Sequence, residues 1–298
     1  MDSVPDVFVE ALCAHLTWRD LETLESTSSS WTTKADIHFS KRRELTVVLH
    51  ANDEGIQVTT LLYEEGVPFI IDPRYDQIER IYLLPFEDDS PPGKMVSPKH
   101  FTNKILPVLS SLVVHCQLDI FESLNQNVTD SVFNAFYSCV QLKKISTANY
   151  GKKCTEFIEH QIGLGHLTGL RLKGDGWPAQ IISSIRSFLN SPILSKLDLR
   201  YSNLTLDFDM VTGFVGRFLD GDRPKRTCLC GPISFPLEDL RSFRPESIED
   251  CSSSNGVNKN VAWALRTDPV FISMEIKDLY PFTKNSPTYI SVCYATIY

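Results

Sequence analysis

Residues 167–173 and 194–200 read LTGLRLK and LSKLDLR. In both segments leucines alternate with charged or small residues, a pattern typical of a strand with one buried face and one solvated face. The strands of a doubly wound α/β domain are covered by helices on both faces and read as nearly continuous apolar runs. The two segments therefore predict an α/β fold whose sheet keeps one face open to solvent.

A similar L-x-x-L-x-L register recurs along the chain, at intervals of 31, 33, 25 and 27 residues. Its five copies, each predicted to be a strand, are 78–83, 109–114, 142–147, 167–172 and 194–199. Amphipathic segments with the apolar spacing of helices follow four of them, at 127–139, 154–163, 177–190 and 206–221. Strands and helices that alternate at a nearly constant period are typical of a solenoid. We predict an irregular leucine-rich-repeat-like α/β solenoid over residues 46–298.

Shorter strands and loops are predicted outside the repeats. The strands are 45–49, 57–63 and 69–72 before the first repeat, and 270–276 and 288–298 near the C-terminus. Polar segments rich in proline or serine predict loops at 87–94 and 245–258. The two C-terminal strands would close the exposed end of the array.

The bulk composition narrows the functional classes. The chain has 298 residues, 42% hydrophobic content and a net charge of −8. It is long enough to bury a full core but lacks the basic character of a general nucleic-acid-binding or membrane-surface-binding protein. The acidic stretch MDSVPDVF does not resemble a signal peptide, and no apolar run reaches the ~20 residues of a membrane span. We expect a cytoplasmic or nuclear protein that binds neither nucleic acid nor membranes.

No pattern in the chain predicts catalysis, a metal site or a cofactor. The eight cysteines are scattered without a C-x-x-C pair, which predicts neither a zinc site nor a disulfide framework. The chain contains no G-x-S-x-G, P-loop, Rossmann or H-E-x-x-H motif. Cys154 and His160 lie on poorly matched faces of a predicted helix. We expect a protein without enzyme activity.

Residues 4–31 read VPDVFVEALCAHLTWRDLETLESTSSSW and predict two short helices. Pro5 suits the first turn of a helix, where its missing N–H costs nothing, and apolar residues follow at helical spacing up to Leu16. The apolar phase breaks after Thr17, so a second helix, capped by Thr17 or Asp20, is expected to run towards Trp31. A helical hairpin that packs on its own domain would show the same apolar spacing.

The order of landmarks in this segment resembles an F-box. That motif has a Leu-Pro start, apolar residues three, four, seven and eight places after the proline, a leucine eleven places after it, then Asp-Leu, a further leucine and a closing tryptophan. The residues on those places are Val4-Pro5, Phe8, Val9, Leu12, Cys13, Leu16, Asp20-Leu21, Leu24 and Trp31. The opening MDSVP is also similar to the large F-box families of nematodes.

The resemblance implies that residues 1–45 form an F-box-like domain that binds a Skp-type adaptor. The adaptor would link the chain to the cullin and RING subunits of an SCF-type ubiquitin ligase, and residues 46–298 would select the target. The residues expected to contact the adaptor are Pro5, Phe8, Val9, Leu12, Leu16, Leu21, Leu24 and Trp31. The alternative is a repeat scaffold or protein-binding module unconnected to ubiquitination, whose N-terminal helices only cap the solenoid.

The open sheet face supplies the candidate target site. Alternate places of the repeat register carry basic side chains on an otherwise acidic chain, interrupted by Asp198. These candidate residues are Lys144, Arg171, Lys173, Lys196 and Arg200. Stacked positive charge predicts binding of an acidic or phosphorylated segment, whereas the plainer interpretation is that a solvated strand face needs charged residues. Because Arg171 and Lys173 are expected to point into water, their reversal to glutamate is expected to leave folding intact.

Overall fold

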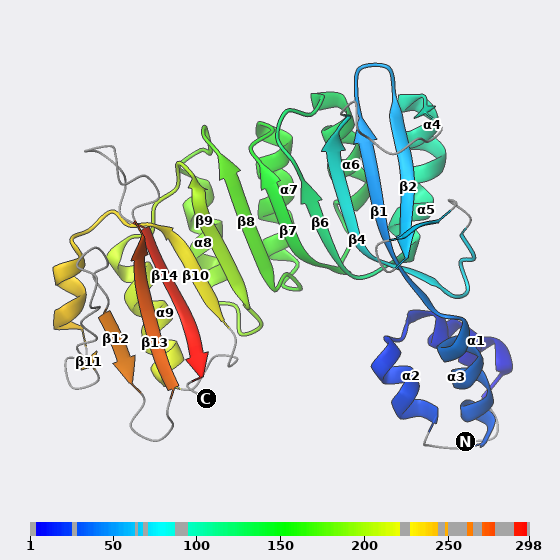
Figure 1. Ribbon diagram of the computed structural model, residues 1–298, viewed down its shortest axis with the longest axis horizontal. Helices are drawn as coiled ribbons and strands as arrows, with labels where there is room; N and C mark the ends of the chain where they lie inside the picture. The colour runs from blue at the N-terminus through cyan, green and yellow to red at the C-terminus, as the bar shows by residue number, and fades with distance from the viewer. Residues whose placement is uncertain are drawn as a thin grey trace. The chain divides into compact units, whose positions relative to one another are not determined.

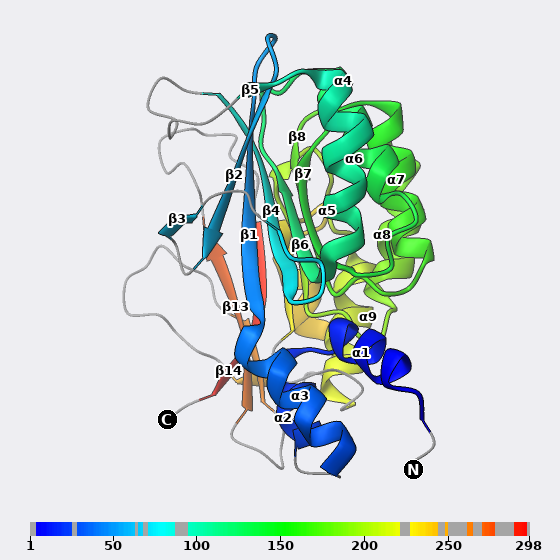
Figure 2. The ribbon, with the colours of Figure 1, turned by 90° about the vertical axis from the view of Figure 1, so that its right-hand side faces the viewer.

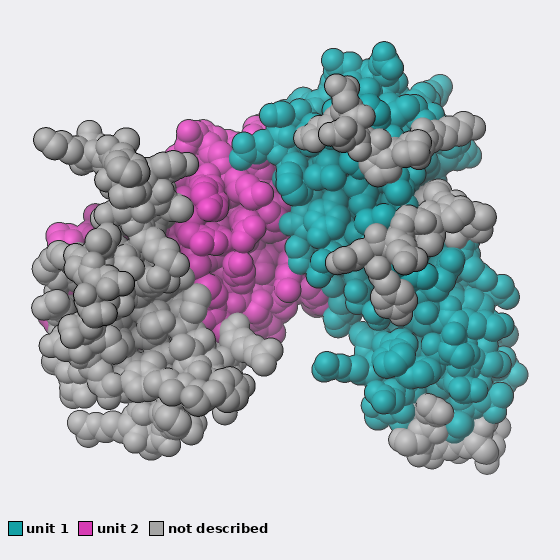
Figure 3. Space-filling view, in the orientation of Figure 1, with its two compact units in different colours: residues 1–142 teal, residues 143–298 magenta. Residues whose placement is uncertain are grey.

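The computed structural model shows a chain of the α/β class with a short N-terminal helical segment, as predicted (Figure 1). It describes residues 4–25, 29–62, 65–67, 71–86, 95–220, 227–243, 248–249, 261–264, 270–277 and 289–296. These divide into two compact units, residues 1–142 and 143–298 (Figure 3). Among the described residues, none of the helices is long and apolar enough to cross a membrane.

Three helices, rather than the two predicted, begin the first unit. They are α1 (Asp6–His15), α2 (Trp18–Glu25) and α3 (Ser29–Lys41). The predicted cap before α2 is confirmed as a reciprocal pair: the Thr17 backbone N–H donates to Asp20 Oδ2 at 3.1 Å, and the Asp20 N–H donates to Thr17 Oγ1 at 3.3 Å. Trp31 lies in α3 instead of closing α2, because a new helix begins at Ser29 within the polar serine run.

The N-terminal helices have a small hydrophobic core of their own. Four fully or almost fully buried residues form it: Val9, Cys13, Leu21 and Ala35. Five partly buried apolar residues pack against them: Val4, Leu16, Leu24, Trp31 and Phe39. The helical spacing seen in the sequence therefore brings α1, α2 and α3 together around their own apolar faces.

The sheet of the first unit contains parallel and antiparallel strands. Its strands are β1 (Arg43–Ala51), β2 (Ile56–Leu62), β3 (Glu65–Val67), β4 (Asp76–Pro85), β5 (Met95–Val96) and β6 (Val113–Ile120). β1 pairs in parallel with β4 and β4 with β6, whereas β2 pairs antiparallel with β1, β3 and β5. The remaining helical segments are α4 (Pro98–His100), the π-helical Phe101–Ile105, α5 (Leu106–Leu112) and α6 (Gln126–Phe136). Helices α5 and α6 lie on one face of this sheet (Figure 2).

Several predicted elements of this unit need correction. The predicted strand 109–114 is wrong: α5 continues to Leu112 and β6 begins only at Val113. Its leucines fit a helix as well as a strand, because a short apolar run does not distinguish the two. Ile71 and Asp72 lie outside any strand, while the rest of predicted strand 69–72 and the predicted loop 87–94 fall outside the described residues.

The second unit alternates strands and helices. Its elements are β7 (Leu142–Ala148), α7 (Lys152–Gly163), β8 (Gly169–Gly174), α8 (Ile181–Leu189), β9 (Lys196–Ser202), α9 (Phe208–Leu219), β10 (Cys228–Pro232), the 3-10 helix Leu237–Ser242, β11 (Ile248–Glu249), β12 (Val261–Ala264), β13 (Val270–Lys277) and β14 (Tyr289–Thr296). Strands β7 to β10 pair in parallel, and β10, β14, β13, β12 and β11 pair antiparallel in that order. The predicted loop 245–258 contains β11, and all of its other residues lie outside the description.

The two faces of strands β8 and β9 differ as the sequence predicts. Leu170, Leu172, Leu197 and Leu199 are at most 1% exposed, and helices α7, α8 and α9 lie on their side of the sheet (Figure 2). Removing a buried leucine of this kind typically costs ~2–5 kcal/mol. The alternate residues of both strands occupy the other face, where the basic side chains are partly solvent-exposed and Asp198 is buried.

Hydroxyl groups repeat at the start of three neighbouring strands. Thr168 Oγ1 donates to the Lys143 carbonyl at 2.9 Å, and Ser195 Oγ donates to the Thr168 carbonyl at 2.9 Å. Thr227 Oγ1 donates to the Leu194 carbonyl at 3.4 Å. Each hydroxyl thus binds a main-chain carbonyl near the start of the preceding strand. We call Thr168, Ser195 and Thr227 the hydroxyl ladder.

Candidate functional site

The eight candidate adaptor residues fall into two groups by exposure. Pro5 is exposed and Phe8 is 56% exposed, while its neighbour Val7, which the sequence analysis did not select, is 80% exposed. Val9 and Leu21 are buried in the core of the N-terminal helices at 4% and 0% exposure. The partly buried members are Leu12, Leu16, Leu24 and Trp31. The available apolar surface is therefore centred on the first turn of α1.

Polar contacts fix the C-terminal end of α1 against the sheet of the first unit. Arg42 donates from Nη2 to the Cys13 carbonyl at 2.6 Å and from Nη1 to the Ala14 carbonyl at 3.2 Å. Gln77 Nε2, on β4, donates to the Ala14 and Leu16 carbonyls at 2.9 and 3.1 Å. Positive charge and N–H donors satisfy carbonyls that a helix end leaves unpaired. The opposite end of α1, with Val7 and Phe8, is left for other contacts.

Three of the five candidate target-binding residues surround Asp198 on the open face of the second unit. The Asp198 side chain is 0% exposed, and its Oδ2 lies 3.1 Å from Arg171 Nε, 2.8 Å from Arg200 Nη2 and 3.9 Å from Lys196 Nζ. Arg200 Nε also donates to Asp198 Oδ1 at 2.9 Å. Asp198, which interrupts the basic row in the sequence, lies at its centre in the structure. We call Arg171, Lys196, Arg200 and Asp198 the Asp198 cluster.

The electrostatics of this cluster favour an ionised carboxylate. Burial raises the pKa of Asp198, but the hydrogen bonds and charge of Arg200, together with the charge of Arg171, outweigh it and hold the pKa below its usual value. The bidentate contact raises the pKa of Arg200. With three cations around one carboxylate, the cluster keeps excess positive charge at the open face.

The two remaining candidates, Lys144 and Lys173, lie on the strands beside this cluster. Lys144 is exposed, and its side chain crosses Gly169, where an added Cβ would come within 3.0 Å of Lys144 Cγ. Lys173 pairs in register with Ala148 of β7 and Tyr201 of β9. The expectation that Arg171 points freely into water is wrong, because it binds the buried Asp198 carboxylate. A reversal of Arg171 would therefore test stability as well as binding.

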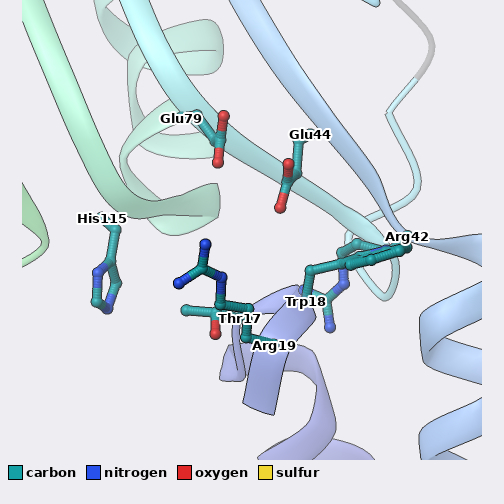
Figure 4. A pocket seen from close by; sticks show the side chains of 7 residues that line it. All are labelled: Thr17, Trp18, Arg19, Arg42, Glu44, Glu79 and His115. Atoms are coloured by element: carbon teal, nitrogen blue, oxygen red, sulfur yellow. The ribbon is translucent and has the colours of Figure 1, made fainter. Parts of the chain in front are cut away.

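A pocket of about 510 Å³ lies between the start of α2 and the sheet of the first unit. It is lined by Thr17, Trp18, Arg19, Arg42, Glu44, Glu79 and His115. In Figure 4 the carboxylates of Glu44 and Glu79 lie near one another and the Arg19 guanidinium points toward them. Trp18 stacks on Phe39 with ring centroids 4.1 Å apart, which holds this edge of the pocket.

Backbone irregularities place the acidic and histidine residues in this pocket. The β1–β4 register shifts beside Glu79, and His115 has a φ of 51° in β6, where the β4–β6 register also shifts. Such bulges redirect side chains in ways that strand periodicity does not predict. Burial and the neighbouring Glu79 carboxylate raise the pKa of Glu44. No sequence pattern predicts this pocket, because its residues meet only through tertiary structure.

Among the residues that the structure describes, no group of three or more histidine, cysteine or acidic side chains is placed to hold a metal ion. No model of a known protein family matches the chain. A comparison with curated proteins finds no match either.

Proposed function

We propose that this chain is the substrate-recognition subunit of an SCF-type ubiquitin ligase, in the cytoplasm or nucleus. In this proposal α1 and its neighbours bind a Skp-type adaptor, the adaptor recruits cullin and RING subunits, and the second unit binds the target. Ubiquitin transfer takes place on the other subunits, so the chain itself has no catalytic residues. The spacing of residues 4–31, which resembles an F-box, is the origin of the proposal.

The exposed apolar side chains at the start of α1 support the proposal most strongly. The N-terminal helices bury a core of their own, yet Val7 and Phe8 have the largest exposed fractions among the described exposed large apolar side chains, at 80% and 56%. A helix that only capped the sheet would bury its bulky apolar residues there. Exposed apolar side chains clustered on one element are typical of protein-binding surfaces.

We further propose that residues 46–298 form an irregular leucine-rich-repeat-like solenoid, and the contacts that support it lie in the second unit. The hydroxyl ladder supports this, because its members lie at equivalent places, 27 and 32 residues apart, and each binds a main-chain carbonyl near the start of the preceding strand. Asn149 and Asn203 also bridge neighbouring strand–helix loops, through bonds to the Asp175 carbonyl and the Trp177 main chain. The Asp198 cluster with Lys144 and Lys173 would then form the target-binding surface for an acidic or phosphorylated segment.

Binding of the full chain to a purified Skp-type adaptor tests the proposal. A Val7→Ala, Phe8→Ala double variant should lose at least about 30-fold in affinity, since buried interface anchors contribute ~2 kcal/mol or more. Both side chains are exposed in the unbound chain, so stability should change by less than ~1 kcal/mol. Calorimetric titration measures the affinity and thermal unfolding measures the stability.

Phe121→Ala is the matched control, because Phe121 is 41% exposed in the same unit but lies outside the N-terminal helices. It should bind the adaptor as the unmodified chain does. Absence of adaptor binding by the unmodified chain would support the scaffold alternative instead. The hydrogen bonds of Arg42 and Gln77 favour that alternative, because they hold the end of α1 against the sheet, as expected for a cap.

A further inference from the structure

Two cysteines lie side by side on β10. Cys228 and Cys230 are two residues apart on a strand, so both occupy the same face of the sheet, and their Sγ atoms are 3.3 Å apart. No disulfide joins them. Cys230 is only 3% exposed, whereas Cys228 is partly exposed. An accessible thiol therefore contacts a buried one.

This dithiol borders the Asp198 cluster. In the parallel β9–β10 pair, Cys228 lies opposite Lys196 and Cys230 lies opposite Asp198. Residues opposite one another share a face, so both thiols lie on the open, basic side. Arg200 is close enough to Cys230 for their charges to interact. The thiolate is the form that attacks disulfides, and this pair lies beside the cations of the Asp198 cluster.

We propose that Cys228 and Cys230 form a redox-active dithiol that exchanges with low-molecular-weight disulfides such as oxidised glutathione. The Cys228 thiolate attacks one sulfur, forms a mixed disulfide and releases one glutathione thiolate. Cys230 gives its proton to solvent and attacks Cys228 Sγ, and the second glutathione leaves as a thiolate. Two electrons pass from the cysteine pair to the glutathione disulfide, and two glutathione thiols form once the thiolates are protonated.

The strand geometry makes this disulfide reversible. Residues two apart on an extended strand have Cα atoms about 6.6 Å apart, close to the upper limit of about 6.8 Å for disulfides. A bond formed at that limit carries strain and is easily reduced, as labile and regulatory disulfides are. The site would respond to the thiol–disulfide balance around the protein, independently of the proposed ligase function.

The test equilibrates the folded full chain with glutathione buffers of increasing oxidised fraction, followed by alkylation and peptide mass spectrometry. Cys228 and Cys230 should lose alkylation together, in a peptide lighter by two hydrogens, and excess reductant should restore both. A second measurement uses phenylarsine oxide, which condenses with two adjacent thiols and releases water. It should protect both cysteines from alkylation without oxidant. This measurement uses the unmodified chain, so it does not depend on whether a cysteine variant folds.

Single variants identify the order of attack. Cys230→Ser should stop at a glutathione adduct on Cys228, and Cys228→Ser should leave Cys230 reduced. Cys139→Ser, which removes another thiol of intermediate exposure, should leave the reaction unchanged. Three results would overturn the proposal: both thiols alkylated at every glutathione ratio, only adducts on Cys228 in the unmodified chain, or a bond between Cys228 and Cys293, which lies opposite it in the β10–β14 ladder.

Discussion

At the scale of single residues, Arg200 and Arg171 together keep the Asp198 carboxylate ionised. Arg200→Ala should destabilise the protein by about 2 kcal/mol, less than the ~3–5 kcal/mol of a fully buried pair, because the Arg200 side chain remains 32% exposed. The matched control Arg186→Ala removes a more exposed partner of Asp207 and should cost less than ~1 kcal/mol. Denaturant unfolding measures both.

The pH dependence provides a second readout of the same contact. The folded-state pKa of Asp198 is lowered, so its stabilising contribution is present above the unfolded pKa of about 4 and is lost as pH falls through the folded value. The two unfolding free energies, with and without Arg200, should therefore converge in acid. Equal costs for the two arginine variants at neutral pH would contradict the central role of Asp198.

Glu44 should show the opposite pH dependence. Burial and Glu79 raise its folded-state pKa, so the protein is most favoured below the unfolded pKa of about 4.3 and loses stability as pH rises through the folded value. Glu44→Gln should therefore raise the melting temperature relative to the unmodified chain at neutral pH, with little difference in acid. Arg42 lines the same pocket and lowers the pKa of Glu44, which reduces the size of the effect. If the melting temperatures of the two proteins differed by the same amount in acid and at neutral pH, this prediction would be wrong.

At the scale of secondary-structure elements, the hydroxyl ladder joins successive strands of the second unit. Thr168→Val keeps the shape of the side chain but removes the donor to the Lys143 carbonyl, and should cost about 1 kcal/mol. Thr205→Val, at an exposed position, is the control and should change stability by less than ~0.5 kcal/mol. Thermal unfolding of both variants checks the difference, and equal effects would remove the energetic support for a repeated contact.

At the scale of the whole molecule, a net charge of −8 coexists with a basic open face. Binding of an acidic or phosphorylated target segment there should weaken as ionic strength rises, because exposed charges are screened over ~8 Å at physiological salt. Lys144→Ala with Lys173→Ala should weaken binding without removing a partner of Asp198. The matched control is Lys99→Ala with Lys104→Ala, at exposed positions of the first unit. Salt-independent binding, or equal losses in the two double variants, would place target recognition elsewhere.

The sequence by itself determined the periodic features of this protein. Alternating leucines identified β8 and β9, 3-4 spacing identified α1 and α6 to α9, and Thr17 with Asp20 identified the start of α2. These are local signals, because a strand or helix repeats its buried face every few residues along the chain. Periodicity failed at 109–114, where a short apolar run fits both a helix and a strand, and at the serine run within which α3 begins.

Only the tertiary structure decided which residues meet. It turned Asp198 from an interruption into the centre of a charged cluster, brought Glu44, Glu79 and His115 into one pocket through bulges, and separated exposed Phe8 from buried Val9. The cysteine pair on β10 depends on both levels. The C-x-C spacing on a strand puts both thiols on one face, but only the tertiary structure places the basic residues of β9 beside them. Contacts between distant segments depend on strand register and bulges, and a single register shift redirects a side chain without leaving a periodic trace in the sequence.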